Sequence, residues 1–286
     1  MINMNAVTFG YGGRPLFEGL TLSLRPGTCY GLLGLNGAGK TSLLKLAAGA
    51  LLPSAGSIEA FGRQPGKRSA AHLADLCFVP EDPLAPEMTV DRWLDRIAVF
   101  RPAFDLPRFR TLLQEFGLDG KGMISAWSYG QRKKFALAGA IASGARLLLL
   151  DEPTNGLDIP GKTQFRRVLS SMLEADRVIV VSTHQVRDLE NLMDPIVVVH
   201  QGHVVFEAAI DALAATLSSV RLPELAGRPV VAARQDALGW HALLAEPGPA
   251  LDIELLFEAA IASPGRLAVA MAGGELPSYD TQEALA

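Results

Sequence analysis

The sequence has few cysteines, almost no excess charge and no long apolar run. Cys29 and Cys77 are its only cysteines, and their apolar surroundings predict reduced core residues rather than a redox or metal site. The 26 basic and 30 acidic residues give a formal net charge of −4, which argues against nucleic acid as a partner. No uncharged apolar stretch reaches the ~18 residues of a membrane span. Because the first charged residue is Arg14, we also expect no signal peptide.

The length and the apolar content set the scale of the fold. A chain of 286 residues forms one large domain or two modest ones and buries a sizeable core. Its hydrophobic fraction of 49% and its mean hydropathy of +0.23 are high for a chain without a predicted span. We therefore expect a cytoplasmic protein whose surplus apolar surface favours a protein partner.

Residues 34–41 read Gly-Leu-Asn-Gly-Ala-Gly-Lys-Thr, which is the phosphate-binding loop pattern G-x-x-x-x-G-K-[ST]. The glycines let the backbone turn its N–H groups toward phosphate oxygens. Lys40 adds a positive charge for the β- and γ-phosphates, and the Thr41 hydroxyl can hold Mg²⁺. Residues 29–33 predict a strand before the loop, and residues 42–48 predict a helix after it, whose N-terminus favours an anion. The pattern predicts a nucleoside triphosphate site.

Two carboxylates follow an apolar strand predicted at 147–150. We expect Asp151, at the end of this strand, to bind Mg²⁺ directly or through water, and Glu152 to polarise the water that attacks the γ-phosphate. The alternative is a strand that ends in a solvated acidic turn, and the upstream phosphate loop makes this the weaker interpretation. Similar apolar runs at 178–181 and 196–199 predict strands that are buried on both faces.

Residues 127–131 read Trp-Ser-Tyr-Gly-Gln and precede a predicted helix. A serine hydroxyl and glycine N–H groups at a helix N-terminus form a second phosphate clamp, and an ordinary N-cap serine is the alternative. Between the phosphate loop and the carboxylates, this segment resembles the signature Leu-Ser-Gly-Gly-Gln of the ATP-binding cassette (ABC) family. The matching positions are Ser128, Gly130 and Gln131. Trp127 and Tyr129 replace the first and third residues of the signature.

The resemblance covers residues 1 to about 210 and implies roles for further residues. The segment from Asn155 to Asp158 resembles the D-loop of the family, which assigns Asp158 to the nucleotide site. His184 resembles the switch histidine, which hydrogen-bonds the γ-phosphate and holds the attacking water. Tyr11 falls where the family stacks an aromatic ring on adenine. The resemblance assigns ATP binding to the phosphate-loop residues Asn36, Gly37, Gly39, Lys40, Thr41 and Ser42.

One position departs from the pattern of the family. The family has glutamine where a loop joins the sheet to the helical insert, but this chain has Glu81 there. We expect Glu81 to bind Mg²⁺ with a full charge, and therefore more strongly than glutamine would, with Asp82 as the less favoured ligand. The stretch around Glu81 resembles bacterial cassette ATPases that serve separate membrane subunits, mostly exporters.

The resemblance implies an α/β fold of the P-loop NTPase class and ABC type, with a mixed sheet core, a helical subdomain and a small C-terminal appendage. It implies an ATPase that dimerises head to tail, with a second copy or with a paired ATPase subunit. Each ATP would lie between Lys40 of one chain and Ser128 of the other. The dimer would drive an integral membrane permease subunit on a separate chain, for export, from the inner face of the cell membrane.

Two other classes of protein carry related motifs. The first is a soluble, non-transport ABC ATPase of the DNA-repair or translation type, but the chain has neither a long coiled coil nor a second cassette. The second is a small-molecule kinase, which has no use for the Ser128 segment. The transport ATPase is therefore the favoured interpretation.

The predicted organisation is an ABC ATPase domain at 1–217, with its helical subdomain at about 83–143, and an accessory domain at 218–286. We expect the accessory domain to be regulatory or to stabilise the dimer. The alternative is a tail that only covers the nucleotide domain.

Three smaller features carry structural predictions. Residues 252–261 have helical spacing, with Asp252 on the solvated side together with Glu254. The basic segment 132–134 predicts a solvated helix face. His200 and His203 fit a hairpin turn better than a metal-ligand pair.

Overall fold

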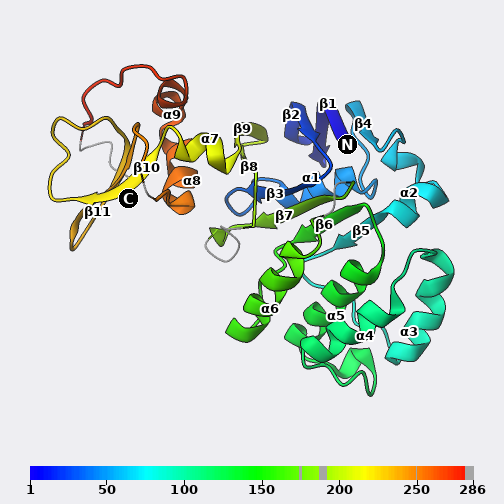
Figure 1. The fold of residues 1–286 in the computed structure, drawn as a ribbon. Coiled ribbons are helices and arrows are strands. Elements are labelled where there is room, and N and C mark those ends of the chain that lie inside the picture. The colour runs from blue at the N-terminus through cyan, green and yellow to red at the C-terminus, as the bar shows by residue number, and fades with distance from the viewer. Residues whose placement is uncertain (174–175, 187–191, 249, 281–286) are drawn as a thin grey trace.

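The structure is a computed structural model that describes residues 1–173, 176–186, 192–248 and 250–280. Two sheets and several helices form the larger part of the molecule, and a third sheet with two helices forms the smaller C-terminal part (Figure 1). Residues 281–286, the end of the predicted accessory domain, lie outside the described residues.

The central sheet has six strands in the order β5-β6-β7-β3-β8-β9. The strands are β3 (Thr28–Leu33), β5 (Leu76–Val79), β6 (Leu147–Asp151), β7 (Val178–Thr183), β8 (Ile196–His200) and β9 (His203–Ala208). Neighbouring strands are parallel except β8 and β9, which form the antiparallel hairpin predicted around His200 and His203. The apolar runs at 147–150, 178–181 and 196–199 are thereby confirmed as buried strands.

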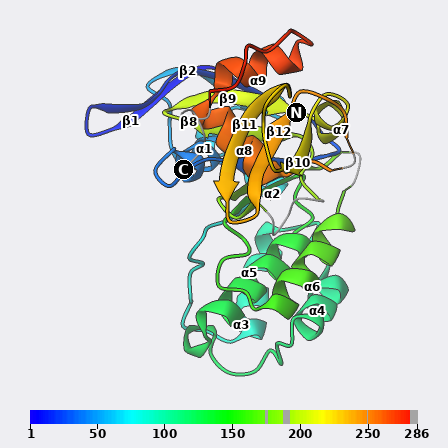
Figure 2. The same ribbon diagram turned by 90° about the vertical axis from the view of Figure 1, so that its left-hand side faces the viewer.

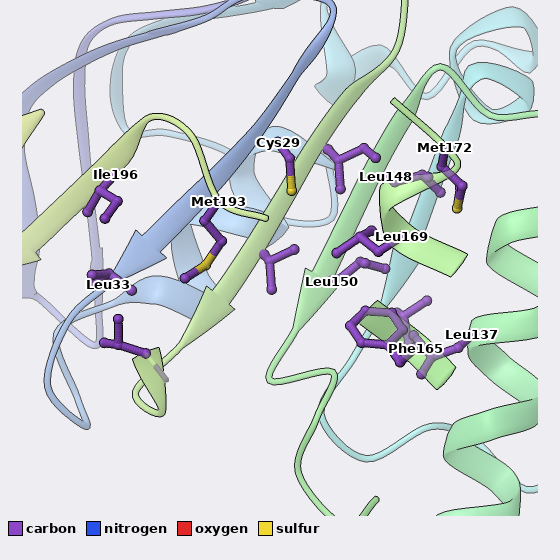
Figure 3. Close-up of a cluster of buried hydrophobic side chains, with 14 of the residues drawn as sticks. Cys29, Leu33, Leu137, Leu148, Leu150, Phe165, Leu169, Met172, Met193 and Ile196 are labelled. Atoms are coloured by element: carbon purple, nitrogen blue, oxygen red, sulfur yellow. The ribbon is translucent and has the colours of Figure 1, made fainter. Parts of the chain in front are cut away.

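Alternate residues of the central strands enter two different cores. Leu148, Leu150 and Val198 face the layer that contains α5 (Tyr129–Ala142) and α6 (Ile159–Ser170). Figure 3 shows labelled side chains of this layer, with Leu148 and Leu150 near Phe165 and Leu169. The intervening residues, such as Leu149, face the opposite layer. This period of two along each strand fixes which face each helix covers.

The opposite layer contains α1 (Lys40–Ala47) and a second, antiparallel sheet. This sheet consists of β1 (Ile2–Tyr11), β2 (Arg14–Leu24) and β4 (Ala55–Ala60) in the order β2-β1-β4. The remaining short helices on this side are η1 (Pro65–Lys67) and α2 (Ala70–Asp75). Residues 7–9 and 20–24, in which apolar and polar residues alternate as is typical of strands, lie in β1 and β2 of this sheet.

The helical subdomain lies at one end of the molecule, away from the third sheet (Figures 1 and 2). Its elements are α3 (Val90–Ile97), η2 (Ala98–Phe100), α4 (Leu106–Glu115), η3 (Ile124–Ala126) and α5. Aromatic rings fill its centre, because Trp93 stacks on Phe109 at 5.7 Å between centroids and meets the edge of Phe135 at 4.9 Å. Pairs of this kind favour a single packing arrangement.

The C-terminal part begins after α7 (Ile210–Ala214). Its sheet consists of β10 (Ser218–Leu222), β11 (Val230–Asp236) and β12 (Gly239–Leu244) in the order β10-β12-β11, followed by α8 (Ile253–Ala262) and α9 (Pro264–Met271). Helix α8 confirms the helix predicted at 252–261. The prediction for Asp252 was wrong, since its carboxylate caps the helix by accepting hydrogen bonds from the backbone N–H groups of Glu254 and Leu255.

Helix α8 lies between the third sheet and the central sheet. It contacts β11 and β12 on one side and β8 and β9 on the other. Its buried residues belong to the same apolar cluster as Ile196 and Val198 of β8. The two parts of the molecule therefore share one continuous core, while the division after residue 217 stays a prediction.

Both cysteines lie in apolar surroundings and are free thiols. Burial raises the pKa of the Cys29 thiol to about 12, and burial also raises the pKa of Cys77. A thiol that stays protonated is a poor nucleophile and a poor metal ligand. Among the described residues, no helix is both long enough and apolar enough to cross a membrane.

Candidate active site

The phosphate loop connects β3 to α1, as its sequence predicts. Gly37 and Gly39 have φ angles of 82° and 100°, a region that side chains other than glycine rarely adopt. A Cβ on Gly39 would also lie 2.6 Å from the Phe17 ring. The Lys40 ammonium group donates to the Gly34 carbonyl at 2.7 Å and is almost fully buried. The loop thus holds a buried cation beside the N-terminus of an eight-residue helix.

Asp151, the last residue of β6, is fixed through both of its carboxylate oxygens. The Thr41 hydroxyl donates to one oxygen at 2.8 Å, and the Ser182 hydroxyl donates to the other at 2.6 Å. Asp151 is opposite Ser182 in the register between β6 and β7. Two of the three residues predicted to hold Mg²⁺, Thr41 and Asp151, are therefore brought together.

Glu152 follows in a left-handed backbone conformation, with φ at 43°. Its carboxylate is buried, 3.7 Å from the Lys40 nitrogen, and one of its oxygens lies 2.8 Å from Nδ1 of His184. The predicted general base and the predicted switch histidine are therefore in direct contact. Both residues thus lie beside the phosphate loop, and their catalytic roles stay predictions.

An open cleft contains most of the predicted nucleotide-binding residues. It is lined by Tyr11, Leu16, Leu35, Asn36, Gly37, Gly39, Lys40, Thr41, Ser42, Glu81, Asp151 and Glu152. The Tyr11 hydroxyl lies 3.1 Å from the Ser42 hydroxyl at the edge of this cleft, with its ring about half exposed. The Glu81 carboxylate accepts a hydrogen bond of 2.9 Å from the Asn155 side chain.

The oxygen donors in this cleft fit Mg²⁺. Thr41 supplies a hydroxyl, and Asp151 and Glu81 supply carboxylates, which are the hard ligands that Mg²⁺ prefers. The part of the chain that the structure describes has no group of three or more His, Cys, Asp or Glu side chains placed to hold a metal. Mg²⁺ in nucleotide sites is bound by one or two carboxylates together with substrate phosphates. The donor set therefore matches magnesium held jointly with a nucleotide.

The signature segment is absent from the lining of this cleft. Ser128 is the N-cap of α5, and its hydroxyl and the Gln131 side chain form a reciprocal capping box. Asp158 caps α6 and pairs with Lys134 at 2.9 Å. The structure thus separates the predicted site residues into two groups, and Ser128, Gly130, Gln131 and Asp158 form the second.

The basic segment 132–134 does not form the solvated face that the sequence predicts. Lys133 is fully buried, with 0% of its surface exposed. Its ammonium group donates to the carbonyl oxygens of Pro80, Glu81 and Asp151 at 3.3, 2.6 and 3.3 Å. Burial lowers the pKa of Lys133 to about 8, and the nearby carboxylates limit this shift.

A signal for this burial was present in the sequence. Lys133, Leu137 and Ala140 are spaced by four and three residues, so they share one face of α5, and both apolar residues are buried. Ser182 also contacts Asp151 but belongs to no sequence motif, and the D-loop resemblance of Asn155 did not indicate its contact with Glu81. Only the pairing of β6 with β7 shows the role of Ser182.

The sequence is similar to those of known ATP-binding proteins. A protein-family model described as ABC transporter matches residues 17–155. A Paraburkholderia xenovorans protein named Nod factor export ATP-binding protein I is 31% identical over 244 residues, covering 82% of this chain and 79% of that protein. A protein of the same name from Burkholderia orbicola is 32% identical over 245 residues, covering 83% of this chain and 80% of that protein. The chain belongs to the ABC transporter family of ATP-binding proteins.

Solved ABC structures have the same fold. The ATP-binding subunit of an ABC transporter superposes with a TM-score of 0.68 at 24% identity, covering 74% of this chain and 91% of that chain. An ATP-binding cassette dimer in a post-hydrolysis state with ADP and Pi gives a TM-score of 0.64 at 18% identity, covering 73% of this chain and 99% of that chain. These likenesses confirm the ABC-type P-loop fold. With the family established, this ABC protein is an ATPase that binds ATP.

Proposed function

We propose that this ABC ATPase works as a head-to-tail pair that drives export through a separate membrane permease. The observation that carries the proposal is the separation of Ser128, Gly130 and Gln131 from the cleft of Lys40 in the same chain. A clamp of N–H groups and a hydroxyl at a helix N-terminus favours phosphate. Its absence from the chain's own cleft supports completion of each ATP site by a second subunit, either another copy or a paired ATPase.

Within the cleft, the nucleotide would be held by the loop and by Tyr11. The loop N–H groups and Lys40 would bind the phosphates, and the half-exposed ring of Tyr11 would stack on adenine. Thr41, Asp151 and Glu81 would hold Mg²⁺. When bound, Mg²⁺ neutralises charge on the β- and γ-phosphate oxygens.

Hydrolysis would proceed by attack of a water oxygen on the γ-phosphorus, with cleavage of the bond to the oxygen that bridges the β- and γ-phosphates. Glu152 would accept the proton of this water. His184, at 2.8 Å from the Glu152 carboxylate, would keep that carboxylate oriented and would hydrogen-bond the γ-phosphate. The left-handed backbone at Glu152 supports this role, since strained conformations of this kind occur at functional sites.

An apolar groove supports docking of a permease segment. It lies where the Glu81 loop meets the helical subdomain, and its walls include Phe78, Pro83, Leu84, Trp93, Ile97 and Phe104. Leu84, in the wall of this groove, is 89% exposed. Exposed apolar clusters of this kind indicate an interaction surface. Docking there would hold the ATPase at the inner face of the membrane, and export agrees with the names of the relatives.

Mixing two inactive variants tests the head-to-tail pair. We expect Ser128→Arg to keep ATP binding but to lose hydrolysis, because bulk and positive charge fill the second clamp. We expect Lys40→Ala to lose its own nucleotide site. In a mixed dimer, one site contains both defects and the other contains neither, so partial ATPase activity should return. The chain that carries both substitutions is the control and should stay inactive.

Two results would contradict the proposal. The first is wild-type hydrolysis by Ser128→Arg. The second is a mixture as inactive as its components, although both variants are folded. Export and the permease are tested separately, by copurification of an integral membrane protein from the native membrane and by loss of that contact in Leu84→Asp.

A further inference from the structure

Tyr129 occupies the signature position where the family has glycine, and its side chain contacts two other segments. The ring lies so close to Gly156, after the carboxylates, that a Cβ there would be 2.1 Å from it. The hydroxyl donates to the backbone carbonyl of Glu81 at 2.7 Å. Tyr129 therefore joins the first turn of α5 to the Glu81 loop and to the segment that follows Glu152.

Lys133 lies one helical turn after Tyr129 and reaches the same carbonyl oxygen. Its ammonium group donates to the Glu81 carbonyl at 2.6 Å and to the Asp151 carbonyl at 3.3 Å. A fully buried cation that is satisfied by backbone carbonyls fixes the path of the backbone rather than the position of one side chain. Lys133 thus connects α5 to two of the three segments that carry the proposed Mg²⁺ ligands, those of Glu81 and Asp151.

The Glu81 side chain adds a further contact between these segments. Its carboxylate accepts a hydrogen bond of 2.9 Å from Asn155, the neighbour of Gly156. The Glu81 carbonyl is held by α5, and the Glu81 carboxylate is held by the loop after Glu152. A displacement of the signature turn would therefore move Glu81 and the Asp151 carbonyl together, because packed interiors transmit shifts rather than absorb them.

We propose that Tyr129 and Lys133 are positioning residues that set the catalytic carboxylates of their own subunit according to the position of that subunit's signature turn. Ser128, Gly130 and Gln131 of the same turn would clamp the ATP of the other subunit. Through Tyr129 and Lys133, closure on that ATP would place Glu81 and Glu152 at the chain's own ATP. This inference rests on the head-to-tail pair and on the catalytic roles proposed above.

Tyr129→Phe tests this link with the smallest change. It keeps the ring against Gly156 and removes only the donor to the Glu81 carbonyl. We expect kcat to fall about 3- to 10-fold, the effect of one hydrogen bond, with KM for ATP and ATP binding within about twofold of wild type. Tyr30→Phe is the matched control, since the buried Tyr30 hydroxyl accepts from the Arg25 backbone N–H at 2.7 Å outside the cleft. It should leave kcat unchanged.

Lys133 is tested by two substitutions. Lys133→Met removes one donor from each of three carbonyl oxygens, of which the Glu81 carbonyl keeps the Tyr129 hydroxyl, and it should lower kcat more than Tyr129→Phe does. Lys133→Gln restores one donor and should recover part of the loss. If Lys133→Met does not fold, Tyr129→Phe and the following experiment still decide the matter.

A second kind of mixed dimer shows on which subunit Tyr129 acts. In a dimer of one chain with Glu152 and one Glu152→Gln chain, isolated through two different affinity tags, both sites bind ATP and only the chain with Glu152 supplies a general base. We expect Tyr129→Phe to lower activity when it is added to the chain with Glu152, relative to the unmodified mixed dimer. Added to the Glu152→Gln chain, it should have less effect.

Each outcome has a distinct meaning. Activity that falls only when Tyr129→Phe is in the Glu152→Gln chain would show a direct role at the other subunit's nucleotide and overturn the link. Equal effects in both chains, or a wild-type kcat for Tyr129→Phe, would also overturn it. Failure of the two chains to pair in the presence of ATP would instead contradict the head-to-tail pair.

Discussion

Replacing Leu255 by alanine should destabilise the whole protein rather than its C-terminal part alone. Leu255 is fully buried in α8, which packs on β8 and β9 as well as on β11 and β12. A buried Leu→Ala change costs about 2–5 kcal/mol from lost burial and the cavity that remains. At about 2–4 °C per kcal/mol for a domain of this order of size, the melting temperature should fall by roughly 4 °C or more.

Scanning calorimetry with and without ATP measures this effect. We expect a single unfolding transition that shifts as a whole, because α8 shares its apolar cluster with Ile196 and Val198 of the nucleotide domain. The matched control is Leu238→Ala in the hairpin between β11 and β12, where the side chain is 80% exposed. Surface changes of this kind stay within about 0.5 kcal/mol, so its transition should hardly move.

Calorimetry could instead show two separate unfolding transitions, only one of which ATP stabilises. If Leu255→Ala shifted only the other transition, residues 218–286 would fold independently, which would contradict this reasoning. A shared transition would instead favour a C-terminal part that covers the nucleotide domain. Deleting that part would then expose the face of β8 and β9, and a loss of activity in the truncated chain would not by itself indicate regulation.

Three further substitutions test the site. Lys40→Ala should abolish tight ATP binding, because the phosphates lose their cationic partner, and unchanged affinity in equilibrium binding would exclude the loop as the site. Glu152→Gln should keep ATP binding and cut hydrolysis by roughly 10²-fold or more. It should also accumulate as an ATP-bound dimer in size-exclusion chromatography, whereas a monomer with the wild-type rate would exclude Glu152 as the base. Glu81→Gln should raise the Mg²⁺ concentration needed for half-maximal ATPase activity, since a neutral amide replaces a charged ligand, and an unchanged Mg²⁺ titration would argue against Glu81 as a ligand.

The sequence was sufficient for the elements that carry strong local patterns. The continuous apolar runs before Asp151 and around residues 178–181 specify buried parallel strands, and the glycines of the phosphate loop specify a turn that other residues cannot adopt. The roles of Glu152 and His184 were predicted separately, and their contact depends on the pairing of β6 with β7, the strands that they follow. The motifs therefore predicted most of the cleft.

Other features depend on contacts between distant segments and leave weak local signals. Lys133 appears as one of several basic residues at a helix start, and its burial depends on carbonyls 18 to 53 residues away. Asp252 is a charged residue, which the sequence places on the solvated side of a helix, but its carboxylate caps α8. Helix α9 was not predicted, since Pro264 and Gly265 interrupt its helical pattern at the first turn, where proline is in fact tolerated.

Ser182 explains how the two carboxylates keep different orientations. Its hydroxyl donates to Asp151 at 2.6 Å, and its hydroxyl oxygen and backbone carbonyl both lie within hydrogen-bonding distance of the Glu152 N–H, at 3.2 and 3.1 Å. A left-handed residue other than glycine costs of order 1–3 kcal/mol and persists only where its surroundings determine it. Because Ser182 lies opposite Asp151 in the register of β6 and β7, the sheet itself holds Glu152 in this turn and directs its carboxylate toward Lys40 and His184. A general base that is oriented in this way needs no rearrangement of its own backbone relative to Asp151.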